Sequence, residues 1–333
     1  MGIIGNLDDP RLQYDYANRE KGTVPPDENR ARFQWASEVA YKNVHRIVTR
    51  GYDTTELVEQ GYGVSDIIFI DFQARIPLEE ELKMLNYCMI MSLEDGLSSP
   101  ANMARIVATS KTILTQAAGA SILAFGHAFG AYDAFGKMLN KGLALVEEGK
   151  TTAEAARIIA KENMGQPHLG VSELMLKDPA AKRMIARAEK LGVAEKYIPF
   201  MKEVIKAVQE LSDEPVEIDM LGAMGCAMFD IGFSPESTWA VLAVTRAFAA
   251  GCHFMEEVEC EPPVRLGEQL TPKELYVGPE DKPVPSLGER SQGVHSGQFA
   301  TPEDWKEGFD ARQKVRGTGW AIVEDIADPR KMQ

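Results

Sequence analysis

One stretch of the chain combines an acid with two arginines in a setting of small and apolar residues. Asp219 ends the run Val-Glu-Ile-Asp, Arg246 lies within an Ala-rich segment, and Arg265 comes soon after two prolines. An arginine in such a setting is costly unless an anion meets it, and a guanidinium binds a carboxylate through two parallel hydrogen bonds. These residue types therefore indicate a site for a substrate that carries a carboxylate.

Two helices joined by a turn at 232–235 are expected to position these residues. Ser234 is a good N-cap for the second helix, and Pro235 fits its first turn. Arg246 and His253 are seven positions apart, so they share one side of that helix with apolar neighbours.

Each of these residues also has a structural interpretation. Asp219 could be the N-cap of a helix, and His253 could be a packed helix histidine. Arg246 could pair with an acid of its own chain instead of a substrate. The acids considered for that pairing are Asp230, Glu256 and Glu257.

The composition limits the classes of protein that the chain can belong to. The net charge of its 333 residues is −14, and no basic stripe is present. That argues against a nucleic-acid binder or a protein held on an anionic membrane. No window approaches the roughly 18 apolar residues that cross a bilayer, and the first residues lack the pattern of a signal peptide.

The cysteines favour a reducing compartment. They stand in apolar helical contexts without a C-x-x-C pair, so we interpret them as reduced core thiols of a cytoplasmic protein. They are Cys88, Cys226, Cys252 and Cys260.

The hydrophobic pattern predicts a nearly all-α chain with one weak β-hairpin near the start. Strand–helix alternation and the glycine-rich phosphate motifs are absent from the sequence, which argues against a nucleotide-binding α/β fold. The expected elements are a hairpin within 33–52, a helix capped by 53–56, two helices within 65–87 broken at 76–77, a helix from 100 past 112, and helices at 151–163, 179–191 and 195–211, with 163–170 irregular.

The two ends differ in character from the rest. Residues 1–30 are polar and are expected to form an extended arm. Residues 262–333 are rich in Pro, Gly and charge, which is typical of a disordered segment or of a tail laid across a partner subunit. Trp305 and Trp320 provide apolar anchors, so we favour the docked tail.

A series of short motifs follows in one order between residues 35 and 266. They are R-G-Y-D at 50–53, A-R-I-P at 74–77, L-E-D-G at 93–96, G-H-A-F-G-A at 126–131, M-G-Q-P-H at 164–168, E-I-D at 217–219, V-T-R-A at 244–247 and P-V-R at 263–265. Each motif is weak alone. Their order and spacing resemble the citrate synthase superfamily, and within it the citryl-CoA lyase-like members and the C-terminal module of ATP citrate lyase.

The resemblance implies an all-α, citrate synthase-like fold: a large helical domain, a smaller inserted helical domain and a short N-terminal β-hairpin. We expect the large domain to comprise 1–135 and 223–333, including the C-terminal tail, and the small domain to comprise 136–222. The resemblance also implies a homodimer with its active site in the cleft between the domains.

The resemblance assigns the proton chemistry to Asp219 and His168. Asp219 would be the acid or base at the carbon beside a coenzyme A thioester, in an apolar setting that raises its pKa. His168 would hydrogen-bond the carbonyl or hydroxyl of the other fragment. Phe129 stands where synthases carry a catalytic histidine, and His127 could supply the lost imidazole.

The same resemblance assigns the binding groups. Arg246 and Arg265 would hold carboxylates, while Lys182 and Arg183 could meet coenzyme A phosphates or could be a solvated helix face. Asp95 replaces a family histidine and would repel an extra carboxylate, so a less acidic fragment than oxaloacetate would suit the site; Asp95 could also be a turn residue. Five dispersed histidines make no metal cluster, and no metal is needed.

The predicted function is a CoA-thioester carbon–carbon lyase or synthase of citryl-CoA lyase type. It would cleave or form a 3-hydroxyacyl-CoA by Asp/His acid–base chemistry, with acyl-CoA and a small organic acid as its ligands. The alternatives are a condensing synthase that uses an unusual 2-oxo acid or ketone, and a non-catalytic paralogue that binds coenzyme A or an organic acid.

Overall fold

A computed structural model of the protein describes residues 37–43, 45–173, 179–261, 284 and 286–287. The predicted N-terminal arm lies outside these residues, and so does the predicted docked tail apart from 284 and 286–287. The elements below belong to one compact unit, Met1–Pro263, and Val264–Gln333 form a second unit.

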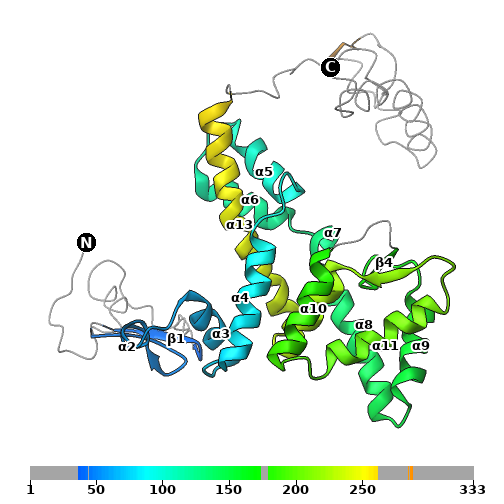
Figure 1. Ribbon diagram of the computed structural model, residues 1–333. Coiled ribbons are helices and arrows are strands. Elements are labelled where there is room, and N and C mark those ends of the chain that lie inside the picture. Colours follow the sequence, from blue (N-terminus) through cyan, green and yellow to red (C-terminus); the bar gives the residue numbers. More distant parts are fainter. Residues whose placement is uncertain (1–36, 44, 174–178, 262–283, 285, 288–333) are drawn as a thin grey trace. The chain divides into compact units, whose positions relative to one another are not determined.

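Helices dominate the described part of the chain (Figure 1), as the sequence predicts. The strands are β1 (Ala40–Lys42), β2 (Ile47–Thr49), β3 (Tyr52–Asp53), β4 (Val171–Glu173) and β5 (Val216–Ile218). The helices are α2 (Thr54–Glu59), α3 (Val64–Gln73), α4 (Glu79–Leu93), α5 (Ser99–Ala108), α6 (Leu114–Ala124), α7 (His127–Gly130), α8 (Tyr132–Glu147), α9 (Thr152–Asn163), α10 (Pro179–Leu191), α11 (Tyr197–Gln209), α12 (Met220–Asp230) and α13 (Pro235–Cys260).

The predicted hairpin is confirmed, and a third short strand extends it. Strands β1, β2 and β3 form an antiparallel sheet in sequence order. The turn between β1 and β2 is held by Asn43, whose Oδ1 accepts the N–H groups of His45 at 2.9 Å and Arg46 at 3.0 Å. Asp53 then caps α2, because its side chain accepts from the N–H groups of Thr55 and Glu56.

Local capping signals also set the starts of two later helices. Thr151 and Glu154 form the predicted capping box at the start of α9. Ser234 accepts the N–H of Ser237 at 3.1 Å at the start of α13, where Pro235 occupies the first turn.

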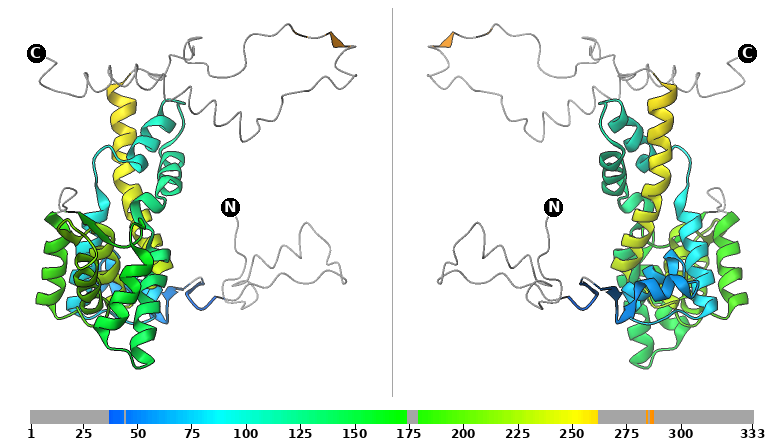
Figure 2. Two further views of the ribbon diagram at one scale, coloured as in Figure 1. Left: turned by 90° about the vertical axis from the view of Figure 1, so that its right-hand side faces the viewer. Right: turned by 90° about the vertical axis from the view of Figure 1, so that its left-hand side faces the viewer.

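The long helix α13 contributes to two apolar cores. Its first half packs with α4, α8 and α12 around a large core that includes Leu85, Phe135 and Leu242. Its second half lies beside α5 and α6, as Figures 1 and 2 show, around a smaller core that includes Ala104 and Phe254. The middle of α13 is therefore the point where the two cores meet.

The prediction that the helix starting near Pro100 runs past Thr112 is wrong, because α5 ends at Ala108. The hydroxyls of Thr109 and Ser110 each bond a carbonyl three residues back, at 2.7 Å, and Lys111 has a left-handed backbone with φ of 57°. Hydroxyl groups that compete for backbone partners end the helix there.

The small antiparallel sheet of β4 and β5 was not predicted. Val171 pairs with Ile218, and Glu173 pairs with Val216. Each strand has three residues, too few for an alternating pattern to show in the sequence. The pairing joins the chain after α9 to the chain before α12.

Candidate functional site

A cavity of about 620 Å³ lies where the loop after α4, the α7 region, the start of α12 and the middle of α13 come together. Its polar or ionisable lining residues are Ser92, Glu94, Asp95, His127, Tyr132, Asp219 and Arg246. Its remaining lining residues are Met91, Phe125, Gly130, Pro167, Ala180, Met220, Leu221 and Met224.

Asp219 is the N-cap of α12, which confirms its structural interpretation, and it also lines the cavity. One carboxylate oxygen accepts the N–H of Gly222 at 2.8 Å, and the backbone N–H of Asp219 donates to the carbonyl of Gly170 at 3.1 Å. A Cβ on Gly222 would lie 2.3 Å from that carbonyl oxygen. Glycine at this position therefore allows the loop before β4 to contact the start of α12.

His168 lies on the loop that precedes Gly170. Its Nε2 is 3.1 Å from Oδ1 of Asn163, the last residue of α9. The neighbouring Pro167 lines the cavity. The contacts of this loop with the start of α12 thus bring Pro167 and Asp219 into one cavity lining, whereas His168 itself is not among the lining residues.

His127 lies at the start of α7 and lines the cavity. Its side chain is 67% exposed, its Nε2 is 3.3 Å from Oδ1 of Asp133, and its ring centroid is 5.0 Å from that of Trp239. Phe129 is in the same short helix, but its side chain is outside the described part.

Arg246 is buried in the middle of α13 and bonds the loop after α4. Its Nε donates to the carbonyl of Ser92, and one terminal nitrogen lies 3.1 Å from Oδ2 of Asp95. The same nitrogen donates to Oγ of Ser98 at 3.3 Å. Arg246 and Asp95, two predicted substrate-binding residues, therefore form an ion pair with each other.

The acids considered as structural partners of Arg246 have other partners. Glu256 and Glu257 pair with Arg105, at 2.6 and 2.7 Å. Asp230 accepts three backbone N–H groups at the start of α11. Arg246 does pair with an acid of its own chain, as the structural interpretation has it, but that acid is Asp95.

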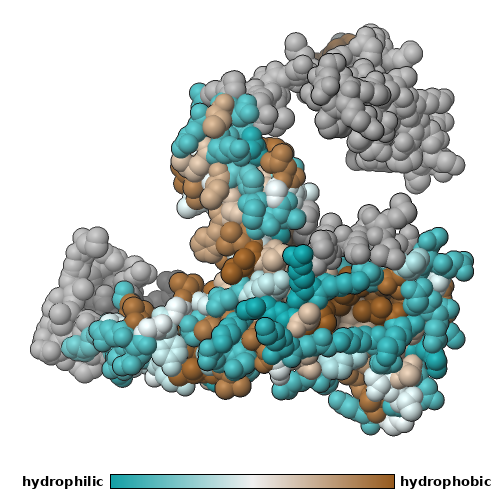
Figure 3. All heavy atoms as spheres, viewed as in Figure 1, coloured by the Kyte–Doolittle hydropathy of each residue, from teal (hydrophilic) through white to brown (hydrophobic). Residues whose placement is uncertain are grey.

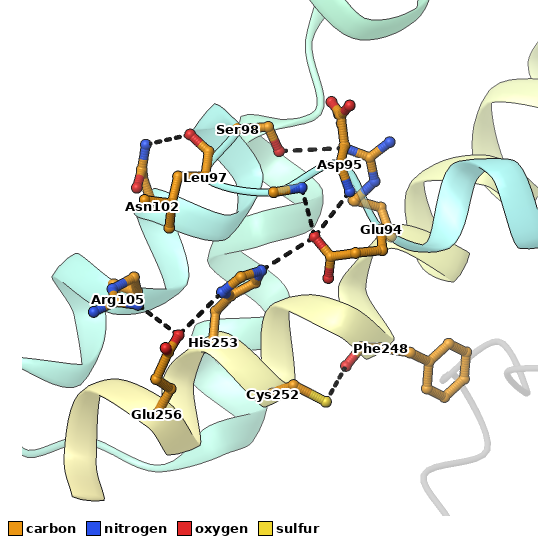
Figure 4. Close-up of polar contacts among 12 residues, drawn as sticks. Glu94, Asp95, Leu97, Ser98, Asn102, Arg105, Phe248, Cys252, His253 and Glu256 are labelled. Atoms are coloured by element: carbon orange, nitrogen blue, oxygen red, sulfur yellow. Dashed lines mark hydrogen bonds and ion pairs between the residues drawn. The ribbon is translucent and has the colours of Figure 1, made fainter. Parts of the chain in front are cut away.

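Glu94 organises the loop after α4 (Figure 4). One of its oxygens accepts the N–H groups of Asp95 at 2.8 Å and Gly96 at 2.7 Å, and lies 3.2 Å from Nε2 of His253. Burial disfavours the charged carboxylate, but the hydrogen bonds from His253 and from the two N–H groups outweigh it. The pKa of Glu94 therefore lies below its ordinary value.

Tyr132 lines the cavity, although the sequence did not predict it as a site residue. It is 2% exposed, and burial, together with the nearby Cys88 and Asp219, raises the pKa of its phenol far above the usual range, although Arg246 opposes this. The phenol is therefore a neutral hydrogen-bond donor. A Cβ on Gly130 would lie 2.4 Å from the ring, so this glycine, which belongs to the 126–131 motif, was the available signal.

The residues predicted to hold coenzyme A lie outside this cavity lining. Lys182 and Arg183 are exposed on α10, and Lys182 pairs with Glu217. Lys182 also borders a separate groove of about 170 Å³. Arg265 lies outside the described residues.

The cysteines are unpaired, but only two are core thiols. Cys88 and Cys226 are buried, whereas Cys252 and Cys260 are exposed, which corrects the prediction for the latter pair. In the described ranges, no group of three or more His, Cys, Asp or Glu residues could hold a metal ion. No helix within those ranges combines the length and apolar character that crossing a membrane requires.

Comparison with known proteins gives structural likeness without sequence matches. No protein-family model matches the chain, and no curated protein does. A citryl-CoA lyase from Hydrogenobacter thermophilus is 20% identical with a TM-score of 0.65, over 78% of this chain and 99% of that one.

Two larger proteins also share the architecture. ATP citrate lyase from Methanothrix soehngenii, solved with citrate and coenzyme A, is 15% identical with a TM-score of 0.56 over 87% of this chain. Citrate synthase from Thermoplasma acidophilum, solved with carboxymethyl coenzyme A and oxaloacetate, is 17% identical with a TM-score of 0.52 over 68% of this chain. The match spans 47% and 60% of those chains. The predicted citrate synthase-like helical fold is thereby confirmed.

Proposed function

We propose that this chain is a CoA-thioester carbon–carbon lyase or synthase of citryl-CoA lyase type. The observation that carries the proposal is the Asp219 carboxylate, which lines a cavity together with an imidazole, a buried phenol and a buried guanidinium. The fold supports it, because the structurally similar proteins include a citryl-CoA lyase and an ATP citrate lyase solved with citrate and coenzyme A.

The proposed reaction is the cleavage of a 3-hydroxyacyl-CoA and its reversal. His168 or His127 accepts the proton of the C3 hydroxyl, the C2–C3 bond breaks, and C3 becomes a carbonyl. The bonding electron pair passes to C2 and the thioester oxygen as an enolate, and Asp219, which enters this direction as the carboxylic acid, protonates C2 to give the acyl-CoA. Tyr132 stabilises the enolate by donating a hydrogen bond to its oxygen.

In the synthesis direction the same groups act in reverse order. Asp219 removes a proton from C2 of the acyl-CoA, and the enolate attacks the carbonyl carbon. His168 or His127 then protonates the new alkoxide. No oxidant or reductant enters either direction.

The binding assignments remain part of the proposal. In this proposal Arg246, Arg265, Asp95 and Phe129 are the substrate-binding residues. Lys182 and Arg183 meet the phosphates of coenzyme A, which would require Lys182 to exchange its Glu217 partner for a phosphate.

The division into a large domain of 1–135 and 223–333 and a small domain of 136–222 is also proposed. The cavity lining supports it, because Asp95 and Arg246 come from the first set, whereas Pro167 and Asp219 come from the second. Asp219 would then face Tyr132 and Arg246 across the boundary between the two domains.

We propose that the protein is a homodimer whose subunits meet through α6 and α13. A groove of about 800 Å³ runs along these helices, with Leu114, Ile122, Val244, Phe248 and Met255 in its lining. Figure 3 shows hydrophobic residues on this part of the described surface. Contiguous apolar surface of this kind is typical of an interaction site, and a second copy offers the same surface in return.

The test compares Asp219→Asn with the wild-type chain on citryl-CoA and other 3-hydroxyacyl-CoA thioesters, with acyl-CoA release followed by mass spectrometry. Asparagine preserves the N-cap, so folding is retained while the proton transfer is lost. We expect the rate to fall about 10²–10⁴-fold. Asp213→Asn, at an exposed position, makes the same charge change outside the cavity and should leave the rate unchanged.

A second candidate function is a non-catalytic paralogue that binds coenzyme A or an organic acid. The Arg246–Asp95 ion pair favours it, because the arginine is already partnered by the protein. If Asp219→Asn leaves every thioester rate unchanged while coenzyme A still binds, this second function replaces the first.

A further inference from the structure

The guanidinium of Arg246 is surrounded by groups of the protein itself. Its side chain is 9% exposed, and it is bonded to the Ser92 carbonyl, to Asp95 and to Ser98. Its central carbon also lies 5.8 Å from the centroid of the Phe125 ring. The positive charge that the cavity offers is thus balanced by a carboxylate of the same chain.

Asp95 is fixed in place although its side chain is 54% exposed. Its backbone N–H and that of Gly96 both donate to one oxygen of Glu94, and Gly96 has a left-handed φ of 59°. Glu94 is in turn held by His253, which also lies 3.5 Å from Glu256 (Figure 4). These contacts hold the loop that carries Asp95 against α13.

The charges around the cavity are predominantly negative. Glu94, Asp95 and Asp219 are carboxylates that line it, and Arg246 is the guanidinium in the same lining. A substrate carboxylate that approached Arg246 would find the Asp95 carboxylate already in the position where it could bind the guanidinium. Like charges at short distance in a partly desolvated site repel each other strongly.

We infer that Asp95 occupies the anion position at Arg246, and that the site selects a 3-hydroxyacyl-CoA whose leaving fragment is an uncharged ketone or aldehyde. This inference rests on the proposed function, which it narrows to a substrate class. Cleavage breaks the C2–C3 bond, the hydroxyl proton passes to the base, C3 becomes an uncharged carbonyl group, and C2 takes a proton from the carboxylic acid form of Asp219. The products are an acyl-CoA and the neutral carbonyl compound.

The activity test uses two thioesters with the same tertiary hydroxyl: citryl-CoA, and 3-hydroxy-3-methylbutyryl-CoA, which has no carboxylate on C3. We expect the wild-type kcat/KM for the neutral substrate to be higher by at least about tenfold, and Asp95→Asn to reduce that ratio by about tenfold. A wild-type preference for citryl-CoA, or an unchanged ratio in Asp95→Asn, overturns the inference. Asp213→Asn should keep the wild-type ratio.

A binding measurement separates this inference from the proposed function. Calorimetric titration with oxaloacetate should show an affinity about tenfold higher for Asp95→Asn than for the wild-type chain or Asp213→Asn. If neither thioester is cleaved but this gain is measured, the proposed function fails and the anion role of Asp95 stands. If the wild-type chain binds oxaloacetate as tightly as Asp95→Asn does, the inference fails whatever the activity.

Discussion

At the scale of single residues, the environment of a side chain decides its chemistry more than its type does. Asp219 and Asp95 are both cavity carboxylates, but one caps a helix and the other neutralises an arginine. In our proposal Asp219 therefore transfers a proton to or from the α-carbon of the substrate, whereas Asp95 repels a substrate carboxylate. Two residues of one type thus have different roles in the proposed site.

Buried thiols give a residue-scale prediction that is independent of the proposed activity. Burial raises the pKa of Cys88 to about 12 and that of Cys226 well above its ordinary value, so both remain protonated near neutral pH. We expect N-ethylmaleimide to leave both unmodified in the folded protein and to modify both after denaturation, as measured by peptide mass spectrometry. Labelling of native Cys88 at the rate of the unfolded chain would contradict this burial.

At the scale of elements, the site depends on a close contact between the loop after α9 and the start of α12. Gly170 has a left-handed φ of 75°, and a Cβ there would lie 2.7 Å from the Phe135 ring and 2.9 Å from Cα of Gly222. The pairing of β4 with β5 continues from this contact. A short sheet and two glycines therefore position the His168 loop beside Asp219.

Gly170→Ala should destabilise the protein by both backbone strain and overpacking. The left-handed conformation costs an alanine roughly 1–2 kcal/mol, and overpacking adds roughly 1–3 kcal/mol. Gly192→Ala is the matched control, because Gly192 has a φ of 76° with nothing within 4 Å of its added Cβ. Urea denaturation should show the larger loss for Gly170→Ala. Equal losses in the two variants would mean that the contact with Gly222 is not tight.

At the scale of the whole molecule, the proposed dimer depends on exposed apolar side chains on α6 and α13. Phe248 is 69% exposed and Val244 is 49% exposed, and both line the groove assigned to the second copy. Cys252 lies in the same groove. The proposed dimer would remove these side chains from water and slow the labelling of that thiol.

Phe248→Glu should convert the dimer to a monomer, because the interface would then bury an unpaired charge on each side. Sedimentation velocity over a dilution series measures the change, and faster labelling of Cys252 provides a second readout. Val58→Glu on α2 is the control, since Val58 is 62% exposed and lies outside the groove. A wild-type chain that sediments as a monomer at every concentration of the series would contradict the proposed dimer.

The sequence by itself determined the features that depend on neighbours along the chain. Ser234 and Asp53 begin helices as predicted because an N-cap satisfies the N–H groups of the next two or three residues. The order of short motifs was sufficient to predict the fold, which the structural comparisons confirmed. Asp219 could also be predicted as a site residue from its neighbours along the chain, because an acid that follows an apolar run is visible without coordinates.

Only the tertiary structure decided which of these residues meet. Arg246 and Asp95 are far apart in sequence, and their ion pair depends on α13 crossing the loop after α4. Tyr132 lies in the site because Gly130 leaves room for its ring. Strands β4 and β5 pair with each other although α10 and α11 separate them in the sequence. Contacts between distant segments arise from the packing of whole elements, and local pattern carries no information about that packing.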